Sequence, residues 1–191
     1  MFSHISLLIN KLNTMNFRLD KSDILYTGKV FDLKVDKIEY DTGNSGIREV
    51  VVHPGGSVVL PVTDDGKIVM VTQFRYPFRK TLLELPAGKL NDGEDPLKCA
   101  LRELTEETGY KSEYIEKLGE IYTAPGYCTE TLHLYLARKL KNGKHNREEG
   151  EFGMEVFEFT LEEIEEKIQK GEIVDAKTIC SVFLYKKKFA S

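Results

Sequence analysis

Four glutamates and one arginine are crowded into the stretch GKLNDGEDPLKCALRELTEETGY, between Gly88 and Tyr110. The charged residues that matter here are Glu94, Arg102, Glu103, Glu106 and Glu107. In a helix, Glu103 and Glu107 would share one side, with Glu106 beside them. Carboxylates this close repel one another unless a cation lies among them, and hard divalent ions such as Mg²⁺ take oxygen ligands of this kind. The alternative interpretation is a solvated acidic helix face.

The same stretch carries clear signals for a helix. Asp95 is a suitable N-cap, Pro96 suits the first helical position, and Gly109 can end the helix in a left-handed conformation. The apolar stripe expected to face a core consists of Leu97, Leu101, Leu104 and Thr108. The pattern therefore predicts that the glutamates lie on the opposite side of the helix.

The spacing of these residues resembles the Nudix box of the Nudix hydrolases. The matching fixed positions are Gly88, Glu94, Arg102, Glu103, Glu106, Glu107 and Gly109. Tyr110 departs slightly, because an aliphatic residue is commoner at that position. This direct resemblance covers only the stretch from Gly88 to Tyr110, but its spacing is specific.

The resemblance implies roles for the charged residues of the box and for Ala87, which precedes it. The metal ligands, for Mg²⁺ or for Mn²⁺ as a substitute, would be the backbone carbonyl of Ala87 and the carboxylates of Glu103, Glu106 and Glu107. Glu94 would stabilise the loop before the helix. Arg102 would orient the glutamates through charge-assisted hydrogen bonds. Cys99, within the helix, is expected to be a small packing residue and not a nucleophile.

Features outside the box resemble the ADP-ribose pyrophosphatase branch of this family. Gln73-Phe74-Arg75 ends a predicted strand, and Arg75 would bind a phosphate through two donors. Pro125 lies sixteen residues after Gly109, which is the distance typical of the branch. An exposed strand charge is the alternative for Arg75, and a simple turn is the alternative for Pro125.

An acidic loop is predicted between residues 141 and 153, and it contains Glu148, Glu149 and Glu151. In the ADP-ribose branch such a loop closes over the site. One of its glutamates activates or orients water, and another can bind metal. Glu149 and Glu151 are both candidates for the catalytic role, and Glu151 is also a candidate metal ligand. A solvated loop is the alternative.

The first part of the chain, residues 15–53, reads as strands with a turn at 41–46. It resembles the N-terminal subdomain that pairs across a homodimer in the same branch. Arg48 is a candidate for contacting substrate phosphates or the partner subunit, with an exposed strand charge as the alternative. Glu84 is a candidate for ordering substrate or the dimer. Phe31 is expected in a core or interface, although it could stack on adenine.

Composition narrows the class of protein. The formal net charge of −4 and the pI of about 5.7 give no basic surface for nucleic acid. Three widely spaced cysteines fit reduced thiols and hence a cytoplasmic protein. The apolar run in residues 1–14 is too short to span a membrane. We interpret residues 1–14 as a disordered or non-native extension, with Met15 as the natural start.

Together these patterns predict an α+β fold. The resemblance implies a Nudix-type α/β/α sandwich around a mixed sheet for residues 54–191, preceded by a small β subdomain at 15–53. Residues 57–75 are predicted to form a hairpin with its turn at 64–66. A capping box at Thr160 and Glu163 should begin one helix. A last helix from Asp175 should bury three apolar side chains, those of Ile179, Val182 and Phe183.

The resemblance implies Mg²⁺-dependent hydrolysis of the diphosphate bond of ADP-ribose or a related nucleoside diphosphate sugar. ADP-ribose and water would give AMP and ribose 5-phosphate. Three alternatives stay open: a GDP-mannose or other nucleoside diphosphate sugar pyrophosphatase, a non-catalytic binding module of the same fold, and a structural protein with an acidic helix. The expected partners are a small-molecule substrate and a second copy of the chain, without nucleic acid or membrane.

Overall fold

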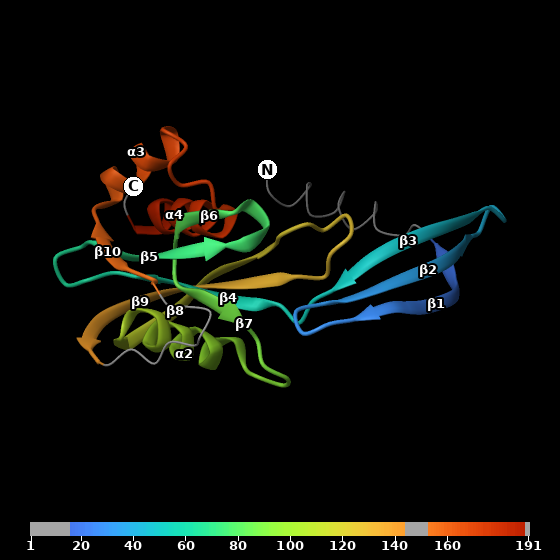
Figure 1. Cartoon of the computed structure of the whole chain (residues 1–191), viewed down its shortest axis with the longest axis horizontal. Helices are drawn as coiled ribbons and strands as arrows, with labels where there is room; N and C mark the ends of the chain where they lie inside the picture. The colour runs from blue at the N-terminus through green and yellow to red at the C-terminus, as the bar shows by residue number, and fades with distance from the viewer. Residues whose placement is uncertain (1–15, 144–152, 190–191) are drawn as a thin grey trace, which may run out of the picture. The chain divides into compact units, whose positions relative to one another are not determined.

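The computed structural model describes residues 16–143 and 153–189 (Figure 1). Its chain divides into two compact units. Within the described residues, the first unit comprises 16–53 together with 126–129, and the second unit comprises the remainder. None of the helices in this part of the chain is both long and apolar enough to cross a bilayer.

The first unit is a three-stranded antiparallel sheet in the order β1-β2-β3. Its strands are β1 (Phe17–Thr27), β2 (Asp32–Tyr40) and β3 (Ser45–Val52). The predicted turn between β2 and β3 is confirmed, with Gly43 at a φ of 83°. Residues 126–129 join this unit because the Val51 amide donates to the Tyr127 carbonyl at 2.7 Å.

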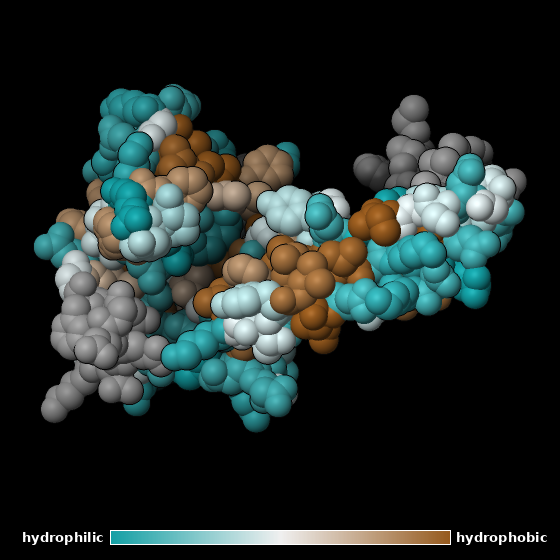
Figure 2. All heavy atoms as spheres, turned by 45° about the vertical axis from the view of Figure 1, so that its right-hand side comes forward, coloured by the Kyte–Doolittle hydropathy of each residue, from teal (hydrophilic) through white to brown (hydrophobic). Residues whose placement is uncertain are grey.

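Many large apolar side chains of the first unit are exposed to solvent. They include Phe17, Leu19, Ile24, Leu25, Tyr26, Val30 and Ile47. Phe31 is also 41% exposed, so within this chain it is not a core residue. Figure 2 shows hydrophobic side chains gathered on one face of this unit. Exposed apolar patches of this kind mark surfaces that contact other molecules.

The second unit contains two sheets. A four-stranded mixed sheet has the order β7-β4-β9-β8, in which β4 and β9 are parallel and the other pairs are antiparallel. Its strands are β4 (Gly56–Pro61), β7 (Ala87–Lys89), β8 (Tyr110–Tyr122) and β9 (Thr131–Asn142). A three-stranded antiparallel sheet has the order β10-β5-β6, with β5 (Ile68–Arg75), β6 (Lys80–Glu84) and β10 (Val156–Phe159). A short 3₁₀ helix, η1 (Tyr76–Phe78), joins β5 to β6.

Strands β4 and β9 are buried on both faces, because alternate side chains enter two different cores. The larger core contains Val58, Leu60, Leu134, Leu136, Ile164 and Val182. The smaller core contains Val59, Ala100, Leu104, Tyr135 and Ala137. Helix α2 (Pro96–Thr108) covers the smaller core, whereas α3 (Leu161–Gln169) and α4 (Ala176–Phe189) lie on the other side (Figure 1). This layering confirms the predicted α/β/α sandwich.

The hairpin predicted at residues 57–75 is wrong in its pairing. The turn itself forms, since the Thr63 amide donates to the Lys67 carbonyl at 2.9 Å. Its two strands then separate into different sheets, apart from a single bridge between Val62 and Ile68. β4 pairs with β7 and β9 on its two edges, so no edge is left for β5.

The two C-terminal helices form as predicted, and one of the side chains expected to be buried is exposed. Thr160 and Glu163 form the predicted capping box at the start of α3. Val182 of α4 is buried as expected, and Ile179 packs against the larger core. Phe183 is 60% exposed, so the prediction that it is buried was wrong. It follows Val182 directly and therefore points to a different side of the helix.

Candidate active site

The ends of helix α2 are fixed by the predicted signals. Asp95 Oδ1 accepts hydrogen bonds from the amides of Leu97 at 3.0 Å and Lys98 at 3.2 Å. Pro96 occupies the first helical position. Gly109 ends the helix with a φ of 76°, and its amide donates to the Thr105 carbonyl. These contacts set the start and end of the helix that carries the glutamates.

The buried face of α2 agrees only in part with the face that the sequence predicted. Leu97 is 38% exposed, whereas Glu103 and Glu107 are only 5% and 2% exposed. Two of the four predicted stripe residues, Leu104 and Thr108, are buried together with these glutamates. The carboxylates are therefore not a solvated helix face. They lie against the protein, where uncompensated charge is costly.

Arg102 lies at the centre of the acidic cluster. Its Nε and Nη2 each donate to one oxygen of Glu94, both at 2.9 Å. Its Nη1 donates to Glu103 at 2.5 Å and to Glu106 at 3.0 Å. Nη2 also donates to the Lys89 carbonyl at 3.2 Å. One guanidinium thus fixes three carboxylates, and its own pKa is raised by these hydrogen bonds.

Glu94 anchors the loop that precedes the helix. Its Oε2 accepts a hydrogen bond from the Asn91 amide at 2.9 Å, in addition to the two bonds from Arg102. The hydrogen bonds from Arg102 are the largest cause that lowers the pKa of this carboxyl group, to about 2. Glu94 is therefore ionised at neutral pH and closes the loop onto the helix.

The backbone at residues 86–88 lies directly beside the buried glutamates. The Ala87 amide donates to Glu107 Oε2 at 3.1 Å. Gly88 is required here because a Cβ atom at this position would lie 1.9 Å from Glu103 Oε1. The Pro86 carbonyl accepts from the Val59 amide at 2.9 Å, which ties the segment to the central strand β4.

The donor set of this cluster suits a hard divalent cation. Three carboxyl groups gather around the Arg102 guanidinium, and that of Glu107 lies beside the Ala87 backbone, so the side chains of the cluster offer oxygen ligands. Within residues 16–143 and 153–189, no three acidic, histidine or cysteine side chains already stand in a complete metal-binding arrangement. Arg102 draws Glu103 and Glu106 toward itself, so one cation already lies between these two carboxylates.

Cys99 is buried in the first turn of α2. Its thiol donates weakly to the carbonyls of Gly88 and Lys89, both at 3.6 Å. Burial, followed by the charge of Glu103, raises the pKa of this thiol to about 11. The thiol is therefore protonated at neutral pH, which agrees with the predicted packing role.

A second charged cluster is formed by side chains of β5, β6 and the start of α4. Arg75 donates to both oxygens of Glu84, with Nε at 2.9 Å and Nη2 at 2.6 Å. Lys177 Nζ also donates to Glu84, and it pairs with Asp175 at 3.0 Å. Burial opposes ionisation of Glu84, but the hydrogen bonds from Arg75 and the charge of Lys177 outweigh it and lower its pKa.

Two residues of this cluster, Lys177 and Asp175, were not predicted as site residues. Lys177 contacts Glu84 directly, and Asp175 contacts Lys177. The available signal was Asp175 followed by Thr178, which is a typical helix N-cap. That signal indicates a helix start, and it does not indicate which residues the helix contacts. Glu84 and Lys177 are separated by 93 positions in the sequence.

Of the remaining predicted residues, Arg48 and Pro125 are described by the structure, and the loop glutamates are not. Arg48, in the first unit, donates to the Ile47 carbonyl at 2.8 Å and to the Tyr40 hydroxyl. Pro125 is exposed in the segment after β8. Glu149 and Glu151 lie outside the described residues, as does Glu148.

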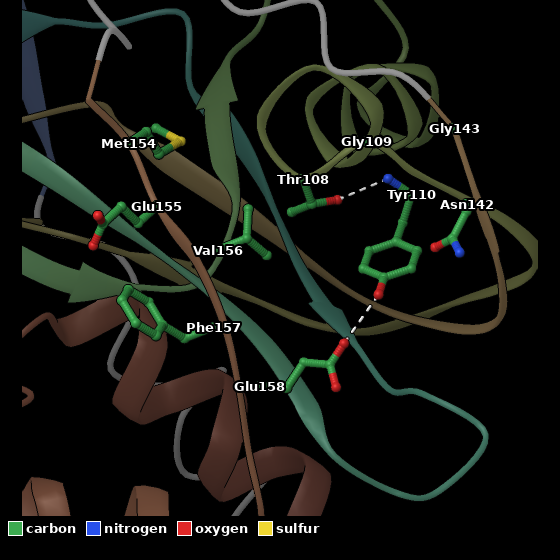
Figure 3. A pocket seen from close by; sticks show the side chains of 10 residues that line it. All are labelled: Thr108, Gly109, Tyr110, Asn142, Gly143, Met154, Glu155, Val156, Phe157 and Glu158. Atoms are coloured by element: carbon green, nitrogen blue, oxygen red, sulfur yellow. Dashed lines mark hydrogen bonds between the residues drawn. The ribbon is translucent and has the colours of Figure 1, made fainter.

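A pocket opens beyond the C-terminal end of α2 (Figure 3). It is lined by Thr108, Gly109, Tyr110, Asn142, Gly143, Met154, Glu155, Val156, Phe157 and Glu158. The Tyr110 hydroxyl donates to Glu158 at 2.9 Å, and burial together with this carboxylate raises the tyrosine pKa. None of the predicted site residues in the described chain lines this pocket, so we place the site at the charged clusters.

A family model described as the NUDIX domain matches residues 53–181. The chain is 46% identical over 160 residues to an ADP-ribose pyrophosphatase of Bacillus subtilis (strain 168), covering 83% of this chain and 86% of the relative. It is 43% identical over 164 residues to a methanol dehydrogenase activator of Bacillus methanolicus, covering 85% and 88%. A GDP-mannose pyrophosphatase of Cronobacter sakazakii is 37% identical over 141 residues, covering 69% and 73%.

A solved structure, titled crystal structure of ADP compounds hydrolase, has the same fold. The TM-score is 0.82, and the match covers 93% of this chain and 97% of that chain. The sequence identity is 16%, so this likeness concerns the fold alone.

Because Glu94 is paired with Arg102, we expect the folded protein to lose stability in acid. The pKa of Glu94 falls from its ordinary value near 4.5 to about 2 on folding, so its contribution is complete above pH 4.5 and is lost as the pH falls through 2. At pH 7, Glu94→Gln should lower the free energy of unfolding by about 1–2 kcal/mol, reduced by partial exposure of the pair to solvent. The difference from wild type should shrink steadily below pH 4.5, as measured by urea denaturation.

The matched control is Glu113→Gln, which changes a carboxyl group that lies 3.9 Å from Lys141 on the surface. This control should cost less than about 0.5 kcal/mol. An unchanged difference between wild type and Glu94→Gln at pH 7 and pH 3 would contradict the assigned role of the pair.

Proposed function

Because this chain belongs to the NUDIX family and is a Nudix hydrolase, we propose that it cleaves the diphosphate bond of ADP-ribose with the help of Mg²⁺. The reaction consumes one water and gives AMP and ribose 5-phosphate. The observation that carries the proposal is the cluster of box glutamates around Arg102 beside the Ala87–Gly88 backbone.

The choice of substrate is supported by relatives and by the paired side chains of Arg75 on β5 and Glu84 on β6. The relatives named as ADP-ribose pyrophosphatase and GDP-mannose pyrophosphatase both act on nucleoside diphosphate sugars, as their names state. The name of the Bacillus methanolicus relative describes an effect on another enzyme. Higher identity over a larger share of the chain favours ADP-ribose, and GDP-mannose or another nucleoside diphosphate sugar is the alternative.

Nudix hydrolases generally need a divalent metal ion. We propose Mg²⁺, with Mn²⁺ as a substitute, held by the carboxylates of Glu103, Glu106 and Glu107 and the carbonyl of Ala87. Such an ion neutralises phosphate oxygens and lowers the pKa of a bound water. The role of Gly88 is to let Glu103 approach the backbone, and the role of Arg102 is to aim Glu103 and Glu106.

The other proposed roles follow from the position and chemistry of each residue. Arg75 presents a partly exposed guanidinium that suits a phosphate, with Glu84 orienting it. Glu151, or Glu149 in the other register, orients or deprotonates the attacking water, and Glu151 is also a candidate ligand. Pro125, at the spacing from Gly109 that is typical of this branch, would contact the substrate. Arg48 would reach a phosphate or the partner subunit after leaving Tyr40.

We also propose that the protein acts in the cytoplasm as a homodimer formed through its N-terminal β subdomain, residues 15–53. The support is the set of exposed apolar side chains on β1 and in the following turn, among them Ile24 at 67% and Leu25 at 63% exposure. A second copy of the same surface would remove these side chains from water.

A substrate panel tests the proposed function. ADP-ribose, GDP-mannose, UDP-glucose and NADH are incubated with the protein and Mg²⁺, with and without EDTA, and the products are separated by chromatography. ADP-ribose should be converted to AMP and ribose 5-phosphate at the highest kcat/KM, and EDTA should abolish the reaction. Preference for GDP-mannose would select the alternative substrate. Absence of hydrolysis over the whole panel would refute the proposal.

The metal assignment predicts that Glu107→Gln lowers kcat by at least ~10²-fold while the fold is retained. The fold is checked by circular dichroism, and Glu113→Gln serves as the surface control. The loop variants Glu151→Gln and Glu149→Gln should differ in kcat, because only one of these glutamates orients the attacking water. Near wild-type rates in both would remove the loop from the mechanism, and an active Glu107→Gln would refute the metal assignment.

The dimer proposal is tested by sedimentation velocity of the full chain. Ile24→Glu should weaken association by ~10²-fold or more, because it places a charge in the apolar contact. Lys170→Glu, at an exposed position on the second unit, should leave the dimer intact. A wild-type protein that sediments as a monomer at micromolar concentration would contradict the proposal.

A further inference from the structure

Glu84 is bound by two cations that differ in their surroundings. Arg75 Nη2 and Lys177 Nζ both donate to the same atom, Oε2 of Glu84. The Glu84 side chain is 2% exposed and that of Lys177 is 10% exposed, whereas that of Arg75 is 36% exposed. One cation therefore lies inside the protein, and the other borders solvent.

The inner cation, Lys177, is held in place by the start of α4. Asp175 Oδ1 lies 3.0 Å from Lys177 Nζ, and Asp175 Oδ2 accepts from the amide and hydroxyl of Thr178. The Thr178 hydroxyl in turn accepts from the Leu85 amide at 2.9 Å. The beginning of the last helix is thus joined to the residue that follows Glu84.

A buried carboxylate that loses its only cation is strongly destabilised. If Arg75 were the sole partner of Glu84, the guanidinium could not turn to an anionic ligand without leaving such a charge behind. Lys177 removes this obstacle, because it is a second cation on the same carboxylate. Lysine suits this position, since its three donors can serve Glu84 and Asp175 at the same time.

We propose that Lys177 is a positioning residue: it is the permanent counter-ion of Glu84, and it allows Arg75 to exchange Glu84 for a phosphate oxygen of the substrate. This inference rests on the proposed function, because it assumes a diphosphate substrate. Asp175 supports the arrangement by fixing Lys177 and by capping α4.

The kinetic test compares Lys177→Met with wild type in ADP-ribose hydrolysis. Without Lys177, Arg75 is retained by Glu84, so KM should rise about tenfold while kcat changes less than about threefold. Lys177→Arg keeps a cation at this position and should restore most of the affinity. Lys186→Met, which removes an exposed lysine from the same helix, should leave both constants unchanged.

A double-mutant cycle separates positioning from a general effect on the fold. Arg75→Ala alone should raise KM. Adding Lys177→Met together with Glu84→Gln, so that no buried carboxylate is left without a cation, should cause little further change, because Lys177 acts through Arg75. If KM instead rises by the product of the separate factors, the inference is wrong. Failure of the proposed function is recognised separately, because the wild-type protein itself would then hydrolyse no nucleoside diphosphate sugar.

A measurement on the unaltered protein covers the case in which Lys177→Met does not fold. The ¹⁵N–¹H signal of Arg75 Nε, identified by its loss in Arg75→Lys, is followed during titration with ADP-ribose in the presence of EDTA. Saturation with ADP-ribose should shift this signal, because Nε leaves Glu84 Oε1. A signal that stays unchanged at saturation would overturn the inference.

Discussion

A single guanidinium holds together an acidic cluster that would otherwise repel itself. Arg102 binds Glu94 through two donors and binds Glu103 and Glu106 through a third, and all four side chains are at least partly withdrawn from water. The arrangement depends on the exact ends of α2 and on the absence of a side chain at Gly88. The cluster would be costly to build for stability alone, since buried ion pairs contribute little net free energy.

The rest of the second unit brings separate parts of the chain to this cluster. β4 lies between the two cores and holds the neighbouring segment by the bond from the Val59 amide to the Pro86 carbonyl. The Ser57 hydroxyl donates to the Pro96 carbonyl at 2.7 Å and so joins the same strand to the start of α2. Helix α4 contacts the segment from the other side through Thr178. The candidate site is therefore fixed by the central sheet and by helices on both of its faces.

Local signals in the sequence predicted the ends of α2 and the capping box of α3, whereas the resemblance to the Nudix hydrolases implied the layered fold. Local signals did not predict that Glu103 and Glu107 are buried, because a leucine pattern cannot reveal that Gly88 leaves room for Glu103. The pairing of β4 with β9 was also missed, because a strong turn at residues 64–66 suggested a hairpin and parallel pairing leaves no local signal. The contact of Lys177 with Glu84 also has no local signal, because the two residues are 93 positions apart in the sequence.

We propose that the buried glutamates of α2 hold a divalent metal ion beside the Ala87 carbonyl. Crystals soaked with Mn²⁺ test it most directly, because the anomalous signal of manganese locates the ion independently of any assay. The prediction is a peak at about 2–2.5 Å from oxygens of Glu103 or Glu107 and from the Ala87 carbonyl. Manganese bound elsewhere on the protein, with no peak at these oxygens, would contradict the claim.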